Sequence, residues 1–285
     1  MTENTLLNYK VTYLSLAKIN LFLHVVSKRN DGYHNLQTIF QLLNYGDEME
    51  FKSREDGLVN RNYSNKAIPS NKDLVLKSAY LLKELSGTKK GVDISLIKKI
   101  PIGGGLGGGS SNAATTLIAL NKLWKLNYSK EKLTEIGKTL GSDVPVFLSG
   151  KTSWAEGTGE LLIPITLPKY FYLVVSINKQ ISTQEVFTHK ALTMSPVQRK
   201  MTDFSDVSNL HNDCLDAAID IEGEIEFALL YLDRTANHLG LARMTGTGCC
   251  VFVAFEKEKD ALKAKQELPS KWTGFVAQAI NKSPL

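Results

Sequence analysis

A dense run of glycines in the middle of the chain has the composition of a loop that a ligand approaches closely. Six of the seven residues at positions 103–109 are glycine, with leucine at position 106. Glycine lacks Cβ, so ordering such a loop costs extra backbone entropy. A folded protein tolerates that cost where another group must come near the main chain, so we interpret this run as a binding loop.

The place of the run in the chain predicts that its ligand is a phosphate. The alternating apolar residues at 92–96 predict a strand before it, and the Ala- and Leu-rich residues 112–125 predict a helix after it. The loop amides and the positive end of that helix would converge on an anion. The two following serines can cap the helix, donate to phosphate or reach a metal. The residues assigned to this site are Pro101, Gly103, Gly104, Gly105, Leu106, Gly107, Gly108, Gly109, Ser110 and Ser111.

Other readings of the glycine run fit less well. A Walker loop needs Lys after its last glycine, where Ser110 stands. A dinucleotide-binding GxGxxG pattern is met, but no acidic residue follows at the end of a second strand to bind a ribose. A flexible hinge is the structural alternative, although hinges rarely begin with Pro101 and end in a well-formed helix.

Three polar residues have two readings each. Lys18 falls inside the apolar segment 17–26, and Asp143 lies in the sequence Gly-Ser-Asp-Val-Pro. The plain reading makes Lys18 a solvent-facing strand residue and Asp143 a helix cap or turn residue. The alternative is a cation and a carboxylate that meet in a cleft and steady a phosphoryl group. Asn20 would share the strand face of Lys18 and contact the same ligand, or else be a polar residue at a strand edge.

Several motifs, in the same order, resemble those of the GHMP kinases. The segment 101–114 resembles their phosphate-binding motif, and 17–23 resembles their first motif. Residues 31–40 resemble, more narrowly, the members whose substrate carries a cytidine diphosphate group. Residues 141–147 and 245–252 are similar to later motifs. The resemblance runs from about residue 15 to the C-terminus.

This resemblance implies a two-domain kinase of the α/β (α+β) class. It implies an S5-like, ATP-binding N-terminal domain over residues 1–157 and a substrate-binding α+β domain over 158–285. The cleft between them would hold ATP with Mg²⁺ and a small molecule carrying cytidine diphosphate. The implied reaction transfers the γ-phosphate to a hydroxyl of that molecule, a precursor in isoprenoid synthesis.

The resemblance also assigns roles to single residues. Lys18 and Asp143 match the catalytic positions, and we expect them to pair. Tyr33 would stack on the cytosine and His34 would read its hydrogen-bonding edge, while Phe187 would cover the opposite side of the base. By residue type alone, Tyr33 is a half-buried aromatic, His34 a surface histidine and Phe187 a core residue. The substrate-binding residues assigned are Asn20, Tyr33, His34, Thr183 and Phe187.

The chain departs from the family pattern at two positions. Asp73 replaces an amide that helps to read adenine, which puts that contact in doubt. Cys249 replaces a small Ala or Ser, and we expect the loop to survive because Cys is also small. No cluster of metal-ligand residues is apparent, so the metal ligands are unassigned. We expect Mg²⁺ to be held mainly by ATP phosphates, with Ser110 or Ser111 as the nearest hydroxyls.

The elements that must position these residues are expected as follows. Strands are predicted over 11–16, 19–26, 36–43, 92–96, 171–177, 241–244 and 250–255, with a turn at Asn30-Asp31-Gly32. Helices are predicted over 71–85 with Asn71 as N-cap and Gly87 past its end, 112–125, 129–140 with Ser129 as N-cap, 223–239 ending at Gly240, and 256–267.

Composition excludes several classes of protein. The 285 residues are 43% hydrophobic and 22% charged, which is ordinary for a globular chain and argues against disorder or a coiled coil. No apolar run is long enough for a membrane span, and we expect no signal peptide. Three cysteines without metal-type spacing indicate the cytoplasm rather than a disulfide framework.

The charge and the motifs leave two rival functions open. The net charge of +5 is too weak and dispersed to argue for nucleic acid. An RNA-binding protein on the same fold would need a basic face, for which Lys89-Lys90 and Lys98-Lys99 are the best candidates. Another GHMP kinase, such as a homoserine or mevalonate kinase, would have no base to stack on Tyr33. The sequence leaves open whether the chain forms a homodimer.

Overall fold

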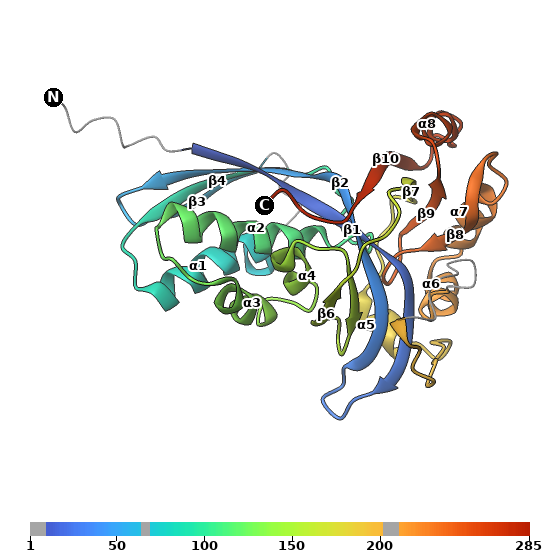
Figure 1. The fold of residues 1–285 in the computed structure, drawn as a ribbon, viewed down its shortest axis with the longest axis horizontal. Coiled ribbons are helices and arrows are strands. Elements are labelled where there is room, and N and C mark those ends of the chain that lie inside the picture. Colours follow the sequence, from blue (N-terminus) through green and yellow to red (C-terminus); the bar gives the residue numbers. More distant parts are fainter. Residues whose placement is uncertain (1–9, 64–68, 202–210) are drawn as a thin grey trace.

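The strands of the protein form one hydrogen-bonded sheet that helices cover (Figure 1). The structure is a computed structural model and describes residues 10–63, 69–201 and 211–285. Along the main path the strand order is β3-β4-β2-β10-β7-β9-β8, while β1 and β5 also pair with β2, and β6 pairs with β5. The strands are β1 (Lys10–Lys28), β2 (His34–Arg54), β3 (Val59–Tyr63), β4 (Gly91–Ile97), β5 (Ser153–Glu156), β6 (Leu161–Pro164), β7 (Phe171–Ser176), β8 (His238–Met244), β9 (Cys250–Phe255) and β10 (Thr273–Ile280).

The helices gather in two groups along this sheet (Figure 1). The group α1 to α4 lies with β3 and β4, and the group α6 to α8 lies with β7, β8 and β9. The helices are α1 (Leu74–Ser86), α2 (Gly108–Leu123), α3 (Lys130–Lys138), α4 (Val144–Ser149), α5 (Thr183–Thr188), α6 (Leu215–Ile221), α7 (Glu224–Leu232) and α8 (Glu258–Gln266). The predicted mixed α/β class is confirmed, and the domain boundary at 157 stays a prediction.

Three buried clusters follow the same arrangement. One packs α1 to α4 on β2 and β4, and a second packs α6 to α8 on β7 and β9. The third lies between them and combines residues of β1 such as Ile19 with residues of β9 such as Phe252. It also includes Ile100 and Leu106, which flank and interrupt the glycine run. Ile100 and Leu106 therefore anchor the glycine loop to the buried cluster that contains residues of β1 and β9.

A long hairpin of β1 and β2 runs through the molecule and reaches its lower edge in Figure 1. The predicted turn is confirmed, with Gly32 at φ +86° between the two strands. The prediction of two separate strands over 11–26 was wrong, because β1 is continuous from Lys10 to Lys28. Its register shifts between Leu16 and Lys18, and this β-bulge absorbs the irregularity without ending the strand.

The first helix begins two residues later than a cap at Asn71 would place it. Asp73 is the N-cap, and its carboxylate accepts hydrogen bonds from the amides of Val75 and Leu76. Asn71 lies instead in a separate 3-10 turn, Ser70–Lys72. The predicted end is confirmed, since Gly87 has φ +66° in the C-cap position. Ser129 is confirmed as the N-cap of α3.

Two other helix boundaries were predicted wrongly. Helix α2 begins at Gly108, inside the glycine run, and its N-cap Gly107 offers no side chain, so neither Ser110 nor Ser111 caps it. Helix α7 ends at Leu232, not near Leu239, because Asn237 at φ +63° turns the chain into β8. Among the described residues, every helix is too short or too polar to cross a bilayer.

Candidate active site

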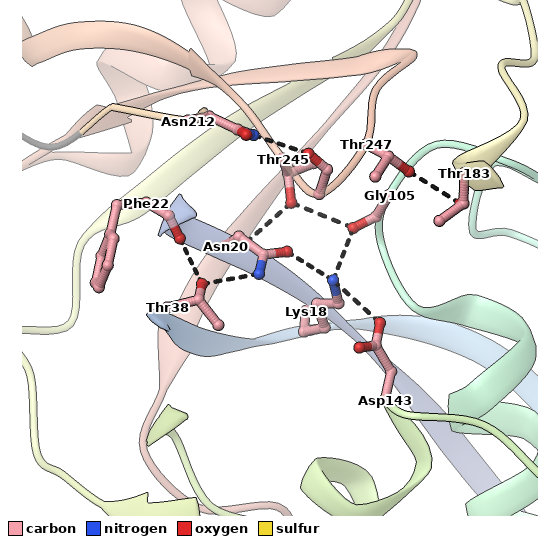
Figure 2. A network of polar contacts seen from close by, with 11 residues as sticks. Lys18, Asn20, Phe22, Thr38, Gly105, Asp143, Thr183, Asn212, Thr245 and Thr247 are labelled. Atoms are coloured by element: carbon pink, nitrogen blue, oxygen red, sulfur yellow. Dashed lines mark hydrogen bonds and ion pairs between the residues drawn. The ribbon is translucent and has the colours of Figure 1, made fainter. Parts of the chain in front are cut away.

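The middle of β1 presents Lys18 and Asn20 to a shared polar centre (Figure 2). The Lys18 side chain is only 3% exposed, so its ammonium needs several partners to offset the loss of water. It donates to Asn20 Oδ1 at 2.6 Å and to the Gly105 carbonyl at 3.0 Å. Its Nζ also lies 5.1 Å from the centre of the Phe40 ring. The plain reading of Lys18 as a solvent-facing lysine is therefore wrong.

Asp143 supplies the counter-charge from the start of α4. Its carboxylate lies 3.2 Å from Lys18 Nζ, which confirms the predicted pair (Figure 2). Asp143 occupies the N-cap position of α4, but its side chain makes no capping hydrogen bond. With 28% of its side chain exposed, Asp143 contacts the lysine and also lines the cavity described below. It is thus free to accept a hydrogen bond from a bound hydroxyl.

Two threonines complete the polar centre around Asn20. Asn20 Nδ2 donates to Thr38 Oγ1 at 2.8 Å, and Thr38 in turn donates to the Phe22 carbonyl. The Asn20 amide donates to Thr245 Oγ1 at 2.9 Å, and Thr245 donates to the Gly105 carbonyl at 3.2 Å. The Gly105 carbonyl therefore accepts hydrogen bonds from both Thr245 and Lys18. These bonds hold the glycine loop against β1 and against the loop after β8 (Figure 2).

Several positions in the loop have a backbone conformation or a close contact that only glycine fits. Gly103, Gly105 and Gly107 have φ values of +74°, +73° and +68°, where other residues are strained. A Cβ on Gly105 would lie 2.1 Å from the Thr245 carbonyl oxygen, and one on Gly107 would lie 2.8 Å from the Phe147 ring. The loop is thus packed against two other segments and is not a free hinge.

A cavity of about 460 Å³ opens beside this loop. It brings together most of the predicted site residues from β1, the glycine loop, the start of α4 and α5. Ser111 is the glycine-loop residue that does not line it. The predicted residues in its lining are Lys18, Asn20, Pro101, Gly103, Gly104, Gly105, Leu106, Gly107, Gly108, Gly109, Ser110, Asp143, Thr183 and Phe187.

Ser111 lies beneath the cavity in a buried polar network. Its Oγ accepts a hydrogen bond from Ser15 Oγ at 2.9 Å. Ser15 Oγ in turn accepts from Asn112 Nδ2, which also donates to Asp47 at 2.9 Å. Asp47 forms an ion pair with Lys98, which itself lines the cavity. This network holds the first turn of α2 in place and makes Ser111 a supporting residue.

Tyr33 and His34 lie at the tip of the hairpin and do not line the cavity. Tyr33 is 64% exposed, whereas His34 is only 8% exposed. The His34 ring stacks on Phe187, with ring centroids 5.2 Å apart and planes inclined by 19°. Burial, helped by the positive charge of Lys28, lowers the pKa of His34. His34 therefore packs on Phe187, whereas the Tyr33 side chain is exposed on the hairpin.

The two residues that depart from the family pattern have clear local environments. Asp73 is 2% exposed, caps α1 and forms an ion pair with Arg61, so its carboxylate is committed to the fold. Cys249 is buried at φ +63°, and burial raises the pKa of its thiol to about 11. Such a thiol stays protonated and inert near neutral pH. That the loop tolerates Cys249 in place of a smaller residue stays a prediction.

Sequence reasoning missed several polar residues of the site. Thr38, Lys98 and Thr247 all line the cavity, and Thr247 Oγ1 lies 3.0 Å from Thr183 Oγ1. Thr245 is fully buried and joins β1 to the glycine loop. Thr245 and Thr247 lie in the motif at 245–252, so that motif could have identified them. Nothing local distinguishes Thr38 from other strand threonines.

Comparisons with known proteins agree with this geometry. Residues 73–151 match the GHMP kinases N terminal domain. A 4-diphosphocytidyl-2-C-methyl-D-erythritol kinase of Ruthia magnifica subsp. Calyptogena magnifica is 54% identical over 274 residues, which cover 96% of this chain and 96% of that relative. A kinase of the same name from Hahella chejuensis (strain KCTC 2396) is 43% identical over 288 residues, covering 98% of this chain and 96% of that one.

Solved structures give the same result at the level of the fold. A crystal structure of 4-(cytidine 5'-diphospho)-2C-methyl-D-erythritol kinase superposes with a TM-score of 0.81 at 28% identity, covering 94% of this chain and 99% of that chain. The Methanococcus jannaschii mevalonate kinase superposes with a TM-score of 0.70 at 17% identity, covering 98% of this chain and 100% of that chain, and shares the fold alone. The chain therefore belongs to the GHMP kinases and, within them, to the 4-diphosphocytidyl-2-C-methyl-D-erythritol kinase family.

Proposed function

We propose that this protein phosphorylates the 2-hydroxyl of 4-diphosphocytidyl-2-C-methyl-D-erythritol with ATP, giving the 2-phosphate and ADP. The names of its relatives supply the substrate. The observation that carries the proposal is the Lys18–Asp143 pair, whose charged atoms lie 3.2 Å apart in the same cavity as the glycine loop. A phosphate-binding loop facing a carboxylate and a cation is the arrangement that phosphoryl transfer to a hydroxyl requires.

The glycine loop and α2 fit the phosphates of ATP. The loop has no side chains over most of its length, and α2 begins within it, so main-chain amides and the positive helix end face the cavity. Ser110 lines the same cavity and offers a hydroxyl. Mg²⁺ keeps several waters and needs few protein ligands, so Ser110 and Asp143 are the oxygen donors that would hold it beside the phosphates. The cation would neutralise charge on the phosphoryl oxygens.

The Lys18–Asp143 pair would act on the attacking hydroxyl. Asp143 would accept its hydrogen bond, orient the oxygen in line with the γ-phosphorus and take its proton as the new P–O bond forms. The bond from the γ-phosphorus to the bridging oxygen breaks, and ADP leaves. Lys18 would hold Asp143 in position and stabilise charge on the transferred group. Phosphoryl transfer passes through a loose transition state, so orientation contributes more than proton removal.

The other end of the cavity would receive the cytidine. Phe187 and Thr183 line it, and the stacked His34 continues that wall toward the hairpin tip. Because the His34 and Phe187 rings lie only 5.2 Å apart at their centroids, the base would stack outside this pair and not between its rings. Tyr33 is the exposed aromatic able to cover the base from the hairpin. Stacking of this kind contributes about 1–3 kcal/mol per base.

We also propose that the protein works in the cytoplasm. Cys214, Cys249 and Cys250 are free and buried, as expected for a chain that works in a reducing compartment. The homodimer and the absence of nucleic-acid binding stay predictions.

The test is an ADP-release assay with purified protein, ATP, Mg²⁺ and the cytidine diphosphate substrate. We expect turnover on that substrate and none on homoserine or mevalonate. Asp143→Asn keeps the shape of the side chain and should lower kcat at least about a hundredfold, because general-base help contributes roughly 10²–10⁴-fold. An unchanged melting temperature would show that the variant is folded. Near-normal turnover by Asp143→Asn would remove its role, and turnover of homoserine alone would overturn the substrate.

A further inference from the structure

A cluster of two histidines and one aspartate lies outside the kinase cavity. His24 comes from β1, and His211 and Asp213 come from the segment that precedes α6. Each offers one ligand atom, and these three atoms all lie within 4.8 Å of one another. His211 Nε2 is 2.6 Å from Asp213 Oδ1, and the two imidazole rings have centroids 4.6 Å apart. The kinase reaction proposed above gives these residues no task.

His24 is the unusual member of the cluster. Its side chain is buried, with 1% of the residue exposed, and neither ring nitrogen has a hydrogen-bond partner among the described residues. Burial of an unpartnered polar group is costly, so such atoms in a folded protein call for an explanation. A ligand held jointly with His211 and Asp213 would satisfy one of these nitrogens.

The backbone around the cluster is already held in position. Asp213 Oδ2 accepts from the Val25 amide at 2.7 Å, and Asp213 Oδ1 accepts from Ser195 Oγ at 3.0 Å. The amide of Asp213 donates to the Leu23 carbonyl at 2.8 Å, and the amide of Leu23 donates to the His211 carbonyl at 3.1 Å. These bonds fix the carboxylate and set the 211–213 segment against β1. His211 is the exposed member of the cluster, whereas His24 and Asp213 are buried.

We propose that His24, His211 and Asp213 bind one divalent transition-metal ion of the zinc class. Two imidazole nitrogens and one carboxylate oxygen suit Zn²⁺ and its neighbours, whereas Mg²⁺ prefers oxygen alone. The exposed side of His211, which is 49% exposed, gives the ion an entry path and leaves a fourth position for water.

An ion at this place would clamp two segments that also support the kinase cavity. Asn212, between two of the ligands, donates to the carbonyls of Met244 at 3.0 Å and Gly246 at 2.8 Å. Gly246 belongs to the loop that packs on Gly105 and lines the cavity. Because the metal binds only the folded cluster, it should raise the melting temperature of the protein.

The test is calorimetric titration of the full chain, without a histidine tag, with ZnSO₄ in excess Mg²⁺. We expect one ion per chain and a rise in melting temperature. His211→Ala should weaken binding at least about tenfold, the scale on which metal sites respond to changed ligation. His189→Ala is the matched control, since it removes a histidine outside the cluster and should leave Zn²⁺ affinity unchanged. Co²⁺ in place of Zn²⁺ should give visible d–d absorption that His211→Ala abolishes.

His24→Phe tests the buried ligand, because it fills the same space without a nitrogen. It should lose Zn²⁺ affinity as His211→Ala does. If this variant does not fold, the comparison of His211→Ala with His189→Ala decides. Absence of Zn²⁺ binding to the unmodified chain would overturn the proposal, as would binding that His211→Ala and His189→Ala affect equally. Kinase activity is measured separately, so failure here leaves the proposed reaction intact.

Discussion

Lys18 Nζ lies 3.2 Å from the Asp143 carboxylate, with the lysine side chain 3% exposed and the aspartate 28% exposed. The cation is thus enclosed by protein while the carboxylate keeps one side toward the cavity. This asymmetry lets Lys18 serve as a fixed charge and leaves Asp143 able to meet a substrate. A buried charge that loses its partners is costly, so the pair has structural as well as chemical consequences.

Lys18→Met should lower kcat at least about a hundredfold, the scale of one lost electrostatic contact in an active site. It also leaves Asn20 Oδ1 and the Gly105 carbonyl without their lysine donor, so the free energy of unfolding should fall. The measurements are steady-state kinetics and thermal unfolding. Lys10→Met is the control, because its ion pair with Glu50 lies on the surface and should contribute little. Equal activity in the two variants would contradict the role of Lys18.

Thr245→Val should raise the KM for ATP and reduce stability by about 1–3 kcal/mol, because a buried hydrogen-bonded group loses its partners. Valine keeps the shape of the side chain but cannot accept from Asn20 or donate to Gly105. Thr134→Val is the control, since that hydroxyl donates to the Lys130 carbonyl on the exposed face of α3. Denaturant unfolding and ATP titrations measure both effects. An unchanged KM would show that the loop keeps its position without Thr245.

Gly105→Ala separates steric fit from backbone strain. The new Cβ would meet the Thr245 carbonyl at 2.1 Å in addition to the strain of φ +73°. Gly87→Ala is the matched control, since Gly87 has φ +66° and nothing within 4 Å of the added Cβ. The control should lose about 1–2 kcal/mol of stability with normal kinetics. Gly105→Ala should lose more and should impair ATP binding; equal losses in both variants would contradict the tight packing of the loop.

His34 should make substrate affinity sensitive to acid. Its lowered pKa keeps the imidazole neutral at neutral pH, with one nitrogen able to accept a hydrogen bond from the base. As pH falls through that pKa, protonation converts this acceptor into a donor. The KM for the cytidine diphosphate substrate should therefore rise as the pH falls below about 6.5, the ordinary pKa of histidine.

His34→Gln checks this assignment, because glutamine keeps an acceptor that does not titrate. The variant should flatten the rise in KM, whereas His189→Gln, away from the cavity lining, should behave as the unmodified protein. A KM that is constant with pH in the unmodified protein, or that rises equally in His34→Gln, would show that His34 does not accept from the base.

Local patterns in the sequence were enough to predict much of the site. The glycine run, the turn at Gly32 and the C-cap at Gly87 depend on backbone conformations that glycine favours, so residue type reveals them directly. The pairing of Lys18 with Asp143 followed from matching the order of the motifs. Strand and helix types were predicted well for β4 and α3, where the apolar period is regular, and for β9, which is a continuous apolar run.

The boundaries that failed depend on contacts outside the local pattern. Asn71 and Asp73 are both good cap residues, and Asp73 is the cap in a fold where it also pairs with Arg61. The prediction overestimated the length of α7, because the mostly polar residues 233–237 that follow Leu232 leave the helix and Asn237 at φ +63° turns the chain into β8. Competing local preferences of similar strength are decided by tertiary packing.

Residue types along the chain were enough to reveal the chemistry that is present: a glycine-rich loop for phosphates, a lysine in an apolar strand and an aspartate before Val-Pro. Which distant groups meet depends on the tertiary fold. Thr245 closes on Gly105, His34 stacks on Phe187, and His24 faces His211 and Asp213. These contacts depend on strand register and on how loops cross the sheet. Neither strand register nor the path of the loops can be read directly from residue type and spacing along the chain.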